Sequence, residues 1–244
     1  MEHAPCISQI ATLLADPKRS AMMWALMDGS ARQTEELALL AGLSPSSASA
    51  HLARLSTGGL LKVEVRGRKR FFRLSAPEVG AAIEALASAT IASAPREIPE
   101  VFKRTTPMAK PQTAPSSLLR ARFCDDHLGG TLAADLYQRL LDAGWIEQLE
   151  QRVVVTHKGA NRLAGRGVFI QALAHRNVQV ACACPDWSER RPHMGGSLGA
   201  ALLQLFMQSG WLTPPNDSRA LQLTATGQRE LHRFARETEL EMAL

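Results

Sequence analysis

Apolar residues recur at helical spacing in several short stretches of the first 92 residues, and polar residues fill the positions between them. Residues 7–14 form one such stretch. Asp16 and Pro17 then supply an N-cap and a first helical residue, so we expect a second helix that runs to Asp28. A later helix over residues 77–92 would place on one face Val79, Ile83, Leu86 and Ala87. The pattern therefore predicts a helical N-terminal region.

Residues 34–57 contain two short helical patterns separated by a glycine. Thr34 is expected to cap a helix over residues 35–41 that stops at Gly42. Ser44 would cap the next helix, in which the apolar positions Ala48, Leu52 and Leu55 form a stripe. This order is typical of a helix-turn-helix, whose second helix reads DNA. The residues expected at DNA on this helix are Ser44, Ser46, Ser47, Ser49, His51 and Arg54.

A basic hairpin is expected directly after the second helix. Residues 60–66 and 70–75 alternate as strands, with a turn at residues 67–69. Six cations stand between residues 62 and 73, against the single acid Glu64. Charge concentrated at a hairpin tip suits phosphates or a minor groove, and the expected contacts are Arg66, Arg68, Lys69 and Arg70. The alternative is an edge hairpin whose cations serve only to keep it solvated.

Composition adds modest support for a polyanionic partner. The chain has 244 residues, is 45% hydrophobic, and carries 28 Lys and Arg against 23 Asp and Glu, a net charge of +5. No stretch approaches a membrane-spanning length and no signal peptide is recognisable, so we expect a cytoplasmic protein without a membrane partner. Four cysteines in a reducing compartment would stay free, bind a ligand or sense redox state.

The second half of the chain contains a repeat. A His-x-Gly-Gly sequence at residues 127–130 recurs at 193–196, and the Gly-Trp pair at 144–145 recurs at 210–211. Each copy, at about residues 121–165 and 187–235, predicts a helix, a two-stranded hairpin and a closing helix, which is a winged-helix-like order. The expected organisation is a first domain over 1–92, a proline-rich linker over 93–116 and a duplicated domain over 117–244. The fold class is thus mainly α with small β-wings, an α+β protein.

The first 90 residues resemble the ArsR/SmtB family of bacterial repressors. The resemblance is carried by Asp16-Pro17, by residues 43–55, by Gly59-Leu60-Leu61 and by residues 67–74. It implies a homodimer that binds double-stranded DNA at a palindromic operator under the control of an effector. The chain departs from the metal-sensing members at residues 36–40, where it has no cysteine. An effector would therefore have to bind elsewhere, and the duplicated domain is the expected sensor.

Side chains that could bind a metal ion or a ligand are concentrated just before each His-x-Gly-Gly sequence. Two thiols and two imidazoles, from Cys124, His127, Cys184 and His193, would supply a tetrahedral set for Zn²⁺ or another thiophilic ion. Further candidates for an effector site are Asp186, Trp187 and Arg190, with Asp186 and Arg190 able to pair on a helical face. The effector stays unknown at this stage. A small organic ligand, redox chemistry and purely structural roles remain alternatives.

Two other classes of protein compete with an effector-controlled repressor. An architectural DNA-binding protein would need no sensor, so it leaves the duplicated domain without a purpose. An enzyme would need a nucleophile, and Cys184 with His193 is the one candidate pair, without an obvious orienting group in the sequence. The motifs of common hydrolases and nucleotide-binding enzymes are absent from the sequence. We therefore expect no catalysis.

Overall fold

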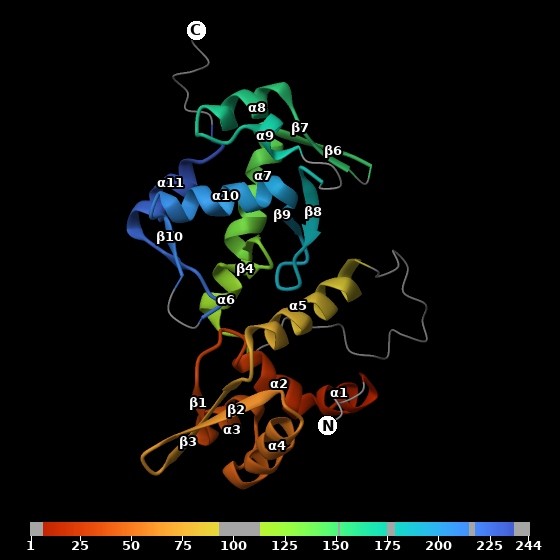
Figure 1. Cartoon of the computed structure of the whole chain (residues 1–244), viewed down its shortest axis with the longest axis vertical. Coiled ribbons are helices and arrows are strands. Elements are labelled where there is room, and N and C mark those ends of the chain that lie inside the picture. Colours follow the sequence, from red (N-terminus) through yellow and green to blue (C-terminus); the bar gives the residue numbers. More distant parts are fainter. Residues whose placement is uncertain (1–6, 93–112, 151, 175–178, 215–217, 237–244) are drawn as a thin grey trace. The chain divides into compact units, whose positions relative to one another are not determined.

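The computed structural model describes residues 7–92, 113–150, 152–174, 179–214 and 218–236. Two compact units divide the chain: residues 1–118 with 216–219, and residues 119–215 with 220–244. Most of the expected linker, residues 93–112, lies outside the described part. Each unit combines helices with small antiparallel sheets, which confirms the α+β class (Figure 1).

The first unit is a winged helix-turn-helix. Its helices are α1 (Ile7–Leu14), α2 (Pro17–Ala25), α3 (Thr34–Ala41), α4 (Pro45–Thr57) and α5 (Pro77–Ala92). Strands β1 (Arg32–Gln33), β2 (Leu61–Arg66) and β3 (Lys69–Leu74) form one sheet in the order β1-β3-β2. The stripe of Ala48, Leu52 and Leu55 is fully buried, as its spacing predicts.

Local signals placed most helix starts correctly in this unit. Asp16 accepts hydrogen bonds from the amides of Lys18 and Arg19, and Ser44 accepts one from the amide of Ser47, so both are N-caps. The cap predicted at Thr34 is wrong. Gln33 holds that position because β1 pairs with β3 and keeps the chain extended through Gln33. Helix α2 also ends at Ala25, three residues before the predicted end at Asp28.

The second unit is built from two copies of one order: hairpin, helix, hairpin, helix (Figure 1). After α6 (Ser116–Arg120), which crosses the boundary, the first copy contains β4 (Arg122–Cys124), β5 (His127–Gly129), α7 (Thr131–Asp142), β6 (Ile146–Leu149), β7 (Arg152–Val155) and α8 (His157–Ala164). A short α9 (Ile170–Leu173) precedes the second, which contains β8 (Cys182–Pro185), β9 (Pro192–Gly195), α10 (Gly196–Gln208), β10 (Leu212–Thr213), β11 (Gln222–Leu223) and α11 (Ala225–Arg233). The predicted winged-helix-like order corresponds to the last four elements of each copy.

The repeated Gly-Trp and Thr-x-x-Gly sequences form the same close contact in both copies. Thr156 and Thr224 cap α8 and α11 by accepting hydrogen bonds from the amides of Gly159 and Gly227. A Cβ atom at Gly159 would lie 1.9 Å from the carbonyl oxygen of Trp145, and one at Gly227 would lie 2.1 Å from that of Trp211. Only glycine fits between helix and hairpin at this distance, which explains why both copies carry it.

The tryptophans of these pairs belong to the apolar core rather than to a ligand site. Trp145 is 3% exposed and packs on Phe234, while Trp211 stacks on Phe206 with ring centroids 5.6 Å apart. Helices α7 and α10 bury their apolar faces in the same core through residues such as Leu136 and Leu202. One shared core thus joins the two copies.

Candidate functional site

The start of α4 and the wing formed by β2 and β3 line one polar hollow in the first unit. The hollow has a volume of about 340 Å³ and is lined by Thr34, Glu35, Pro45, Ser46, Ser49, Arg68, Lys69 and Arg70. The wing turn is the pair Gly67-Arg68, since Arg66 and Lys69 are cross-strand partners, and Gly67 has a φ of 64°. The turn is therefore one residue shorter than predicted, and Lys69 belongs to the strand.

The predicted DNA-contacting cations differ in their surroundings. Arg68, Lys69 and Arg70 are exposed and form no ion pair with any other residue in the described ranges. Arg66 pairs with Glu64 at 2.6 Å and lies over the ring of Phe71. Arg54 is exposed on α4. The tip of the wing therefore carries the cations that are most available to a phosphate.

Of the polar residues predicted on the outer face of α4, some are exposed and others already contact neighbouring groups of the protein. Ser44 is occupied by its capping contact, and the hydroxyl of Ser49 donates to the carbonyl of Pro45 at 2.8 Å. Ser46 and Ser47 are exposed at the first turn of the helix. His51 is only 21% exposed, and its Nδ1 lies 3.8 Å from Oδ1 of Asp16. His51 thus contacts α2 in part, instead of standing fully on the outer face.

In the second unit, the four thiol and imidazole side chains predicted from the repeat lie together. The ligand atoms of Cys124, His127, Cys184 and His193 are all within 4.8 Å of one another. Cys124 and His127 are cross-strand partners on β4 and β5, and Cys184 and His193 are cross-strand partners on β8 and β9. Each copy thus contributes one thiol and one imidazole from equivalent positions of its first hairpin. We call this group the Cys/His cluster.

These hairpins correct one sequence-based expectation. Each copy was expected to begin with a helix, but it begins with a hairpin. His127 and His193 lie in strands, and the following helices begin at Thr131 and Gly196. Strands of only three or four residues are too short to show a clear alternation of apolar and polar positions, so the sequence pattern did not predict them. The second copy also begins at Cys182, earlier than the predicted residue 187.

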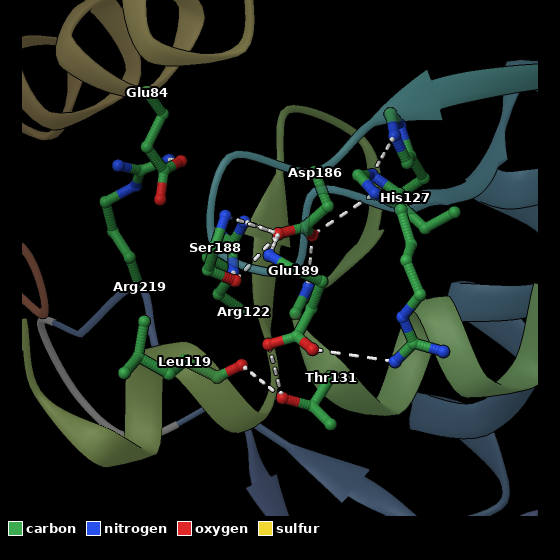
Figure 2. A network of polar contacts seen from close by, with 12 residues as sticks. Glu84, Leu119, Arg122, His127, Thr131, Asp186, Ser188, Glu189 and Arg219 are labelled. Carbon is green, nitrogen blue, oxygen red and sulfur yellow. Dashed lines mark hydrogen bonds and ion pairs between the residues drawn. The ribbon is translucent and has the colours of Figure 1, made fainter. Parts of the chain in front are cut away.

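A buried ionic network lies beside the Cys/His cluster (Figure 2). The guanidinium of Arg122 donates to Oδ1 of Asp186 at 2.9 Å and to the hydroxyl of Ser188 at 3.1 Å, and all three residues are fully buried. Oδ2 of Asp186 accepts a hydrogen bond from the amide of Gly130 at 2.8 Å. Arg122 also lies over the ring of Trp187, 4.4 Å from its centroid. The loop between β8 and β9 is therefore tied to the first copy.

Two of the residues predicted for an effector site, Trp187 and Arg190, lie outside the Cys/His cluster. Trp187 is buried against Arg122, and Arg190 is exposed with a φ of 54° outside any helix. The suggested pairing of Asp186 with Arg190 on a helical face is wrong, because Asp186 pairs with Arg122. The alignment of the two copies gave no sign of this partner, since Arg122 and Asp186 are not equivalent positions.

Both histidines of the cluster face a carboxylate through Nδ1. Nδ1 of His127 lies 2.9 Å from Oδ1 of Asp126, and Nδ1 of His193 lies 3.2 Å from Oδ2 of Asp186. Burial lowers the pKa of each imidazole, but contacts with a carboxylate and with Cys124 outweigh it, so both pKa values are raised. Burial raises the pKa of Asp186, yet His193, Arg122 and the amide of Gly130 together hold it far below its usual value. Asp186 is therefore ionised.

The two thiols of the cluster are coupled to each other. A hydrogen bond from Cys124 lowers the pKa of Cys184, and the same contact, together with burial, raises the pKa of Cys124 to about 11. Cys184 is thus the more readily ionised thiol of the pair. The third described cysteine, Cys182, lies on the same strand but outside the cluster.

Comparisons with known proteins place the chain in a class. It is 33% identical over 224 residues, 92% of its length and 94% of the relative's, to YdfF of Bacillus subtilis, described as an uncharacterized HTH-type transcriptional regulator. The chain therefore belongs to the HTH-type transcriptional regulators, which bind DNA. No protein-family profile matches the chain.

Solved structures resemble about a third of the chain. One is the homodimeric winged helix-turn-helix domain of Mb0332 from Mycobacterium bovis, described as a possible ArsR-family regulator. It is 20% identical, covers 38% of this chain and 85% of its own, and has a TM-score of 0.34. Another is HlyU from Vibrio cholerae, 30% identical over 32% of this chain and 85% of its own, with a TM-score of 0.30.

Among the described residues, none of the helices combines the length and the apolar character that a membrane-spanning helix needs.

Proposed function

We propose that this regulator is an ArsR-like repressor that binds a palindromic operator as a homodimer. Helix α4 would enter the major groove, and the wing would contact phosphates or the adjacent minor groove. The observation that carries the proposal is the hollow shared by Ser46 and Ser49 of α4 with Arg68, Lys69 and Arg70 of the wing. A hydroxyl-bearing helix start beside unpaired cations offers base-edge contacts and phosphate contacts from one surface. Because its partner is double-stranded DNA, we propose that it acts in the cytoplasm.

Self-association is supported by apolar side chains on the first and last helices of the first unit. Ile7 on α1 is 87% exposed and Leu86 on α5 is 62% exposed. Leu86 belongs to the apolar face predicted for residues 77–92. Burying such side chains against a second copy would contribute about 25 cal/mol for each Å² removed from water. Sedimentation of the free protein should therefore give a dimer.

The second unit is proposed as the sensory part. In its first copy, Ile146–Leu149 and Arg152–Val155 form a hairpin that carries Glu147 in its first strand and Glu150 in its turn. These acids stand against Arg152 at the tip, so the hairpin lacks the excess of cations that the wing of the first unit carries. A phosphate backbone would be repelled there, so DNA reading by this hairpin is disfavoured. The unit instead brings thiols, imidazoles and a buried ion pair together, which suits recognition of a small effector.

Catalysis is disfavoured by the burial of the same groups. Asp186 does orient His193, so the sequence-based objection that no orienting group exists is wrong. However, His193 and Asp186 are both 0% exposed, and a general base must reach the proton that it abstracts. A substrate cannot approach His193 in this conformation, which favours a binding role for Cys184 and His193.

The salt dependence of DNA binding tests the operator interface. A DNA fragment enriched from a random pool by the wild-type protein would be titrated with three proteins over a range of salt concentrations. Each lost phosphate contact lowers the slope of log K against log salt by about 0.9, so Arg68→Ala with Lys69→Ala should lower it by about two. The matched control removes two exposed cations of the second unit, Arg152→Ala with Arg233→Ala, and should leave the slope unchanged.

Two outcomes would overturn parts of this proposal. An unchanged slope in the wing variant would remove the wing from the interface. Equal affinity, within a few-fold, for the enriched fragment and for random DNA would favour the architectural alternative. A footprint with two-fold symmetry and half-sites about one helical turn apart is the result expected for a dimer.

A further inference from the structure

We propose that the Cys/His cluster is a closed, tetrahedral site for one Zn²⁺ ion, held jointly by the two copies of the C-terminal repeat. The four ligands are Cys124 and His127 from one copy and Cys184 and His193 from the other. Four N and S ligands without an open position are typical of a zinc site that binds and organises rather than catalyses. Its regulatory meaning rests on the proposed sensory role of this unit, but the binding itself does not.

The orientation of the two imidazoles requires a positive charge between them. A carboxylate only accepts hydrogen bonds, so the carboxylates of Asp126 and Asp186 favour a proton on each Nδ1. In the neutral rings the lone pairs then lie on Nε2. The two Nε2 atoms are 3.1 Å apart, and two lone pairs at that distance repel each other unless a cation lies between them.

The distances fit a zinc ion in that place. With Zn–N bonds of about 2.0–2.1 Å and tetrahedral angles, two Nε2 ligands would lie about 3.3 Å apart. The observed 3.1 Å is close to this value, and the limit of 4.8 Å over all four ligand atoms accommodates the longer Zn–S bonds. The Nδ1 contacts supply the carboxylate–histidine–metal arrangement that fixes ring orientation and raises ligand basicity.

Space and charge at the cluster also favour a divalent ion. A Cβ atom at Gly195 would lie 2.8 Å from Sγ of Cys182, 3.1 Å from Cβ of Cys184 and 3.5 Å from Nε2 of His127, so glycine avoids crowding at this edge of the cluster. Two thiolates cancel the charge of Zn²⁺, whereas a monovalent ion would leave a negative charge in a buried site. Thiolate ligands disfavour Mg²⁺ and Ca²⁺, which prefer oxygen.

A shared proton between the imidazoles is the competing explanation, and it makes no use of the thiols. Titration with Co²⁺, which replaces Zn²⁺ and reports thiolate ligation through intense near-ultraviolet charge-transfer absorption, separates the two. The intact, reduced protein should bind one Co²⁺, displaceable by one Zn²⁺, and native mass spectrometry should show one Zn²⁺ per chain.

Matched cysteine variants assign the ligands. Cys184→Ser removes one of the two thiolates, so the charge-transfer absorption at saturating Co²⁺ should fall by about half. Binding should weaken by more than about 100-fold, because loss of a ligand costs more than the roughly 10–100-fold expected for loss of a residue that only orients a ligand. Cys182→Ser, on the same strand and outside the cluster, should keep both the stoichiometry and the spectrum. Should Cys184→Ser fail to fold, Asp126→Asn serves instead, because its side chain is 65% exposed and it would weaken binding about 10–100-fold.

The results are decisive in both directions. Three outcomes would each overturn the site. The wild-type protein could lack thiolate absorption, the Cys182→Ser variant could lose the metal, or Cys184→Ser and Asp126→Asn could bind it with unchanged affinity. Operator binding is measured on the same preparations. Loss of the metal with operator binding intact rejects the zinc site alone, and metal binding without operator binding rejects the proposed function alone.

Discussion

The wing of the first unit and the first hairpins of the two repeats are both two-stranded hairpins, but they lie in opposite environments. In the wing, Arg68 and Lys69 are exposed at the tip, and neither forms an ion pair with a residue in the part of the chain that the structure describes. In the repeats, Arg122 on β4 is fully buried and neutralised by Asp186. A two-stranded hairpin can thus present charge to a large partner, or enclose charge to organise a small site. The difference comes from what packs on the hairpin, not from its backbone.

The largest expected effect comes from breaking the enclosed pair. Arg122→Met leaves the Asp186 carboxylate buried without its cation, and such a change costs about 3–5 kcal/mol. Urea unfolding of the whole chain measures it. Arg191→Met is the control, because Arg191 and Asp135 are each nearly half exposed and such pairs contribute about 0–1 kcal/mol. Similar losses in both variants would contradict the contrast drawn between the environments.

A smaller loss is expected where helix and hairpin make their closest contact in the repeat. Gly227→Ala would press a methyl group against the carbonyl of Trp211, and overpacking of this kind costs about 1–3 kcal/mol. Gly165→Ala, with no atom nearer than 3.7 Å to the added Cβ and a φ of −62°, should be neutral or slightly stabilising. Thermal unfolding of the two variants checks this, and an unaffected Gly227→Ala would show that the copies tolerate a wider spacing.

The smallest effect is expected in the open wing. Glu64 pairs with Arg66 at 2.6 Å and with Arg73 at 2.9 Å, so Glu64→Gln would remove both ion pairs and one charge that repels phosphate. DNA affinity should rise a few-fold at low salt, with the gain shrinking as salt screens it. Fluorescence anisotropy with labelled DNA measures the change. A fall in affinity would mean that Glu64 orients its arginines for binding.

The sequence predicted the first unit better than the second because the signals there are local. Asp16-Pro17 and Ser44-Pro45 mark helix starts through contacts within three residues, and both were placed correctly. The start near Thr34 was misplaced by one residue, since a strand pairing with Phe71 and Phe72 decides it. Long-range pairing of this kind leaves no trace in a short window of sequence.

In the second unit, the repeat pointed to the four residues of the Cys/His cluster, but not to the strands that carry them. Equivalent positions in a duplicated fold meet around a common axis, which is why matching Cys and His residues could be grouped without any strand prediction. The partners behind them break the symmetry. Asp126 directly precedes His127 in the chain, whereas Asp186 contacts His193 from a longer loop, residues 186–191, whose counterpart in the first copy is only residues 125–126.

The duplication also changes how the cluster responds to protein concentration. A protein with a single copy could complete a two-thiol, two-imidazole set only by meeting a second molecule, so its occupancy would follow the concentration of dimers. Here both halves lie in one chain and share one core, and their effective concentration is fixed by the fold. A regulator present in a few copies per cell would then keep the same affinity for the proposed Zn²⁺ ion as an abundant one, and occupancy of the site would follow the concentration of the ion and not that of the protein.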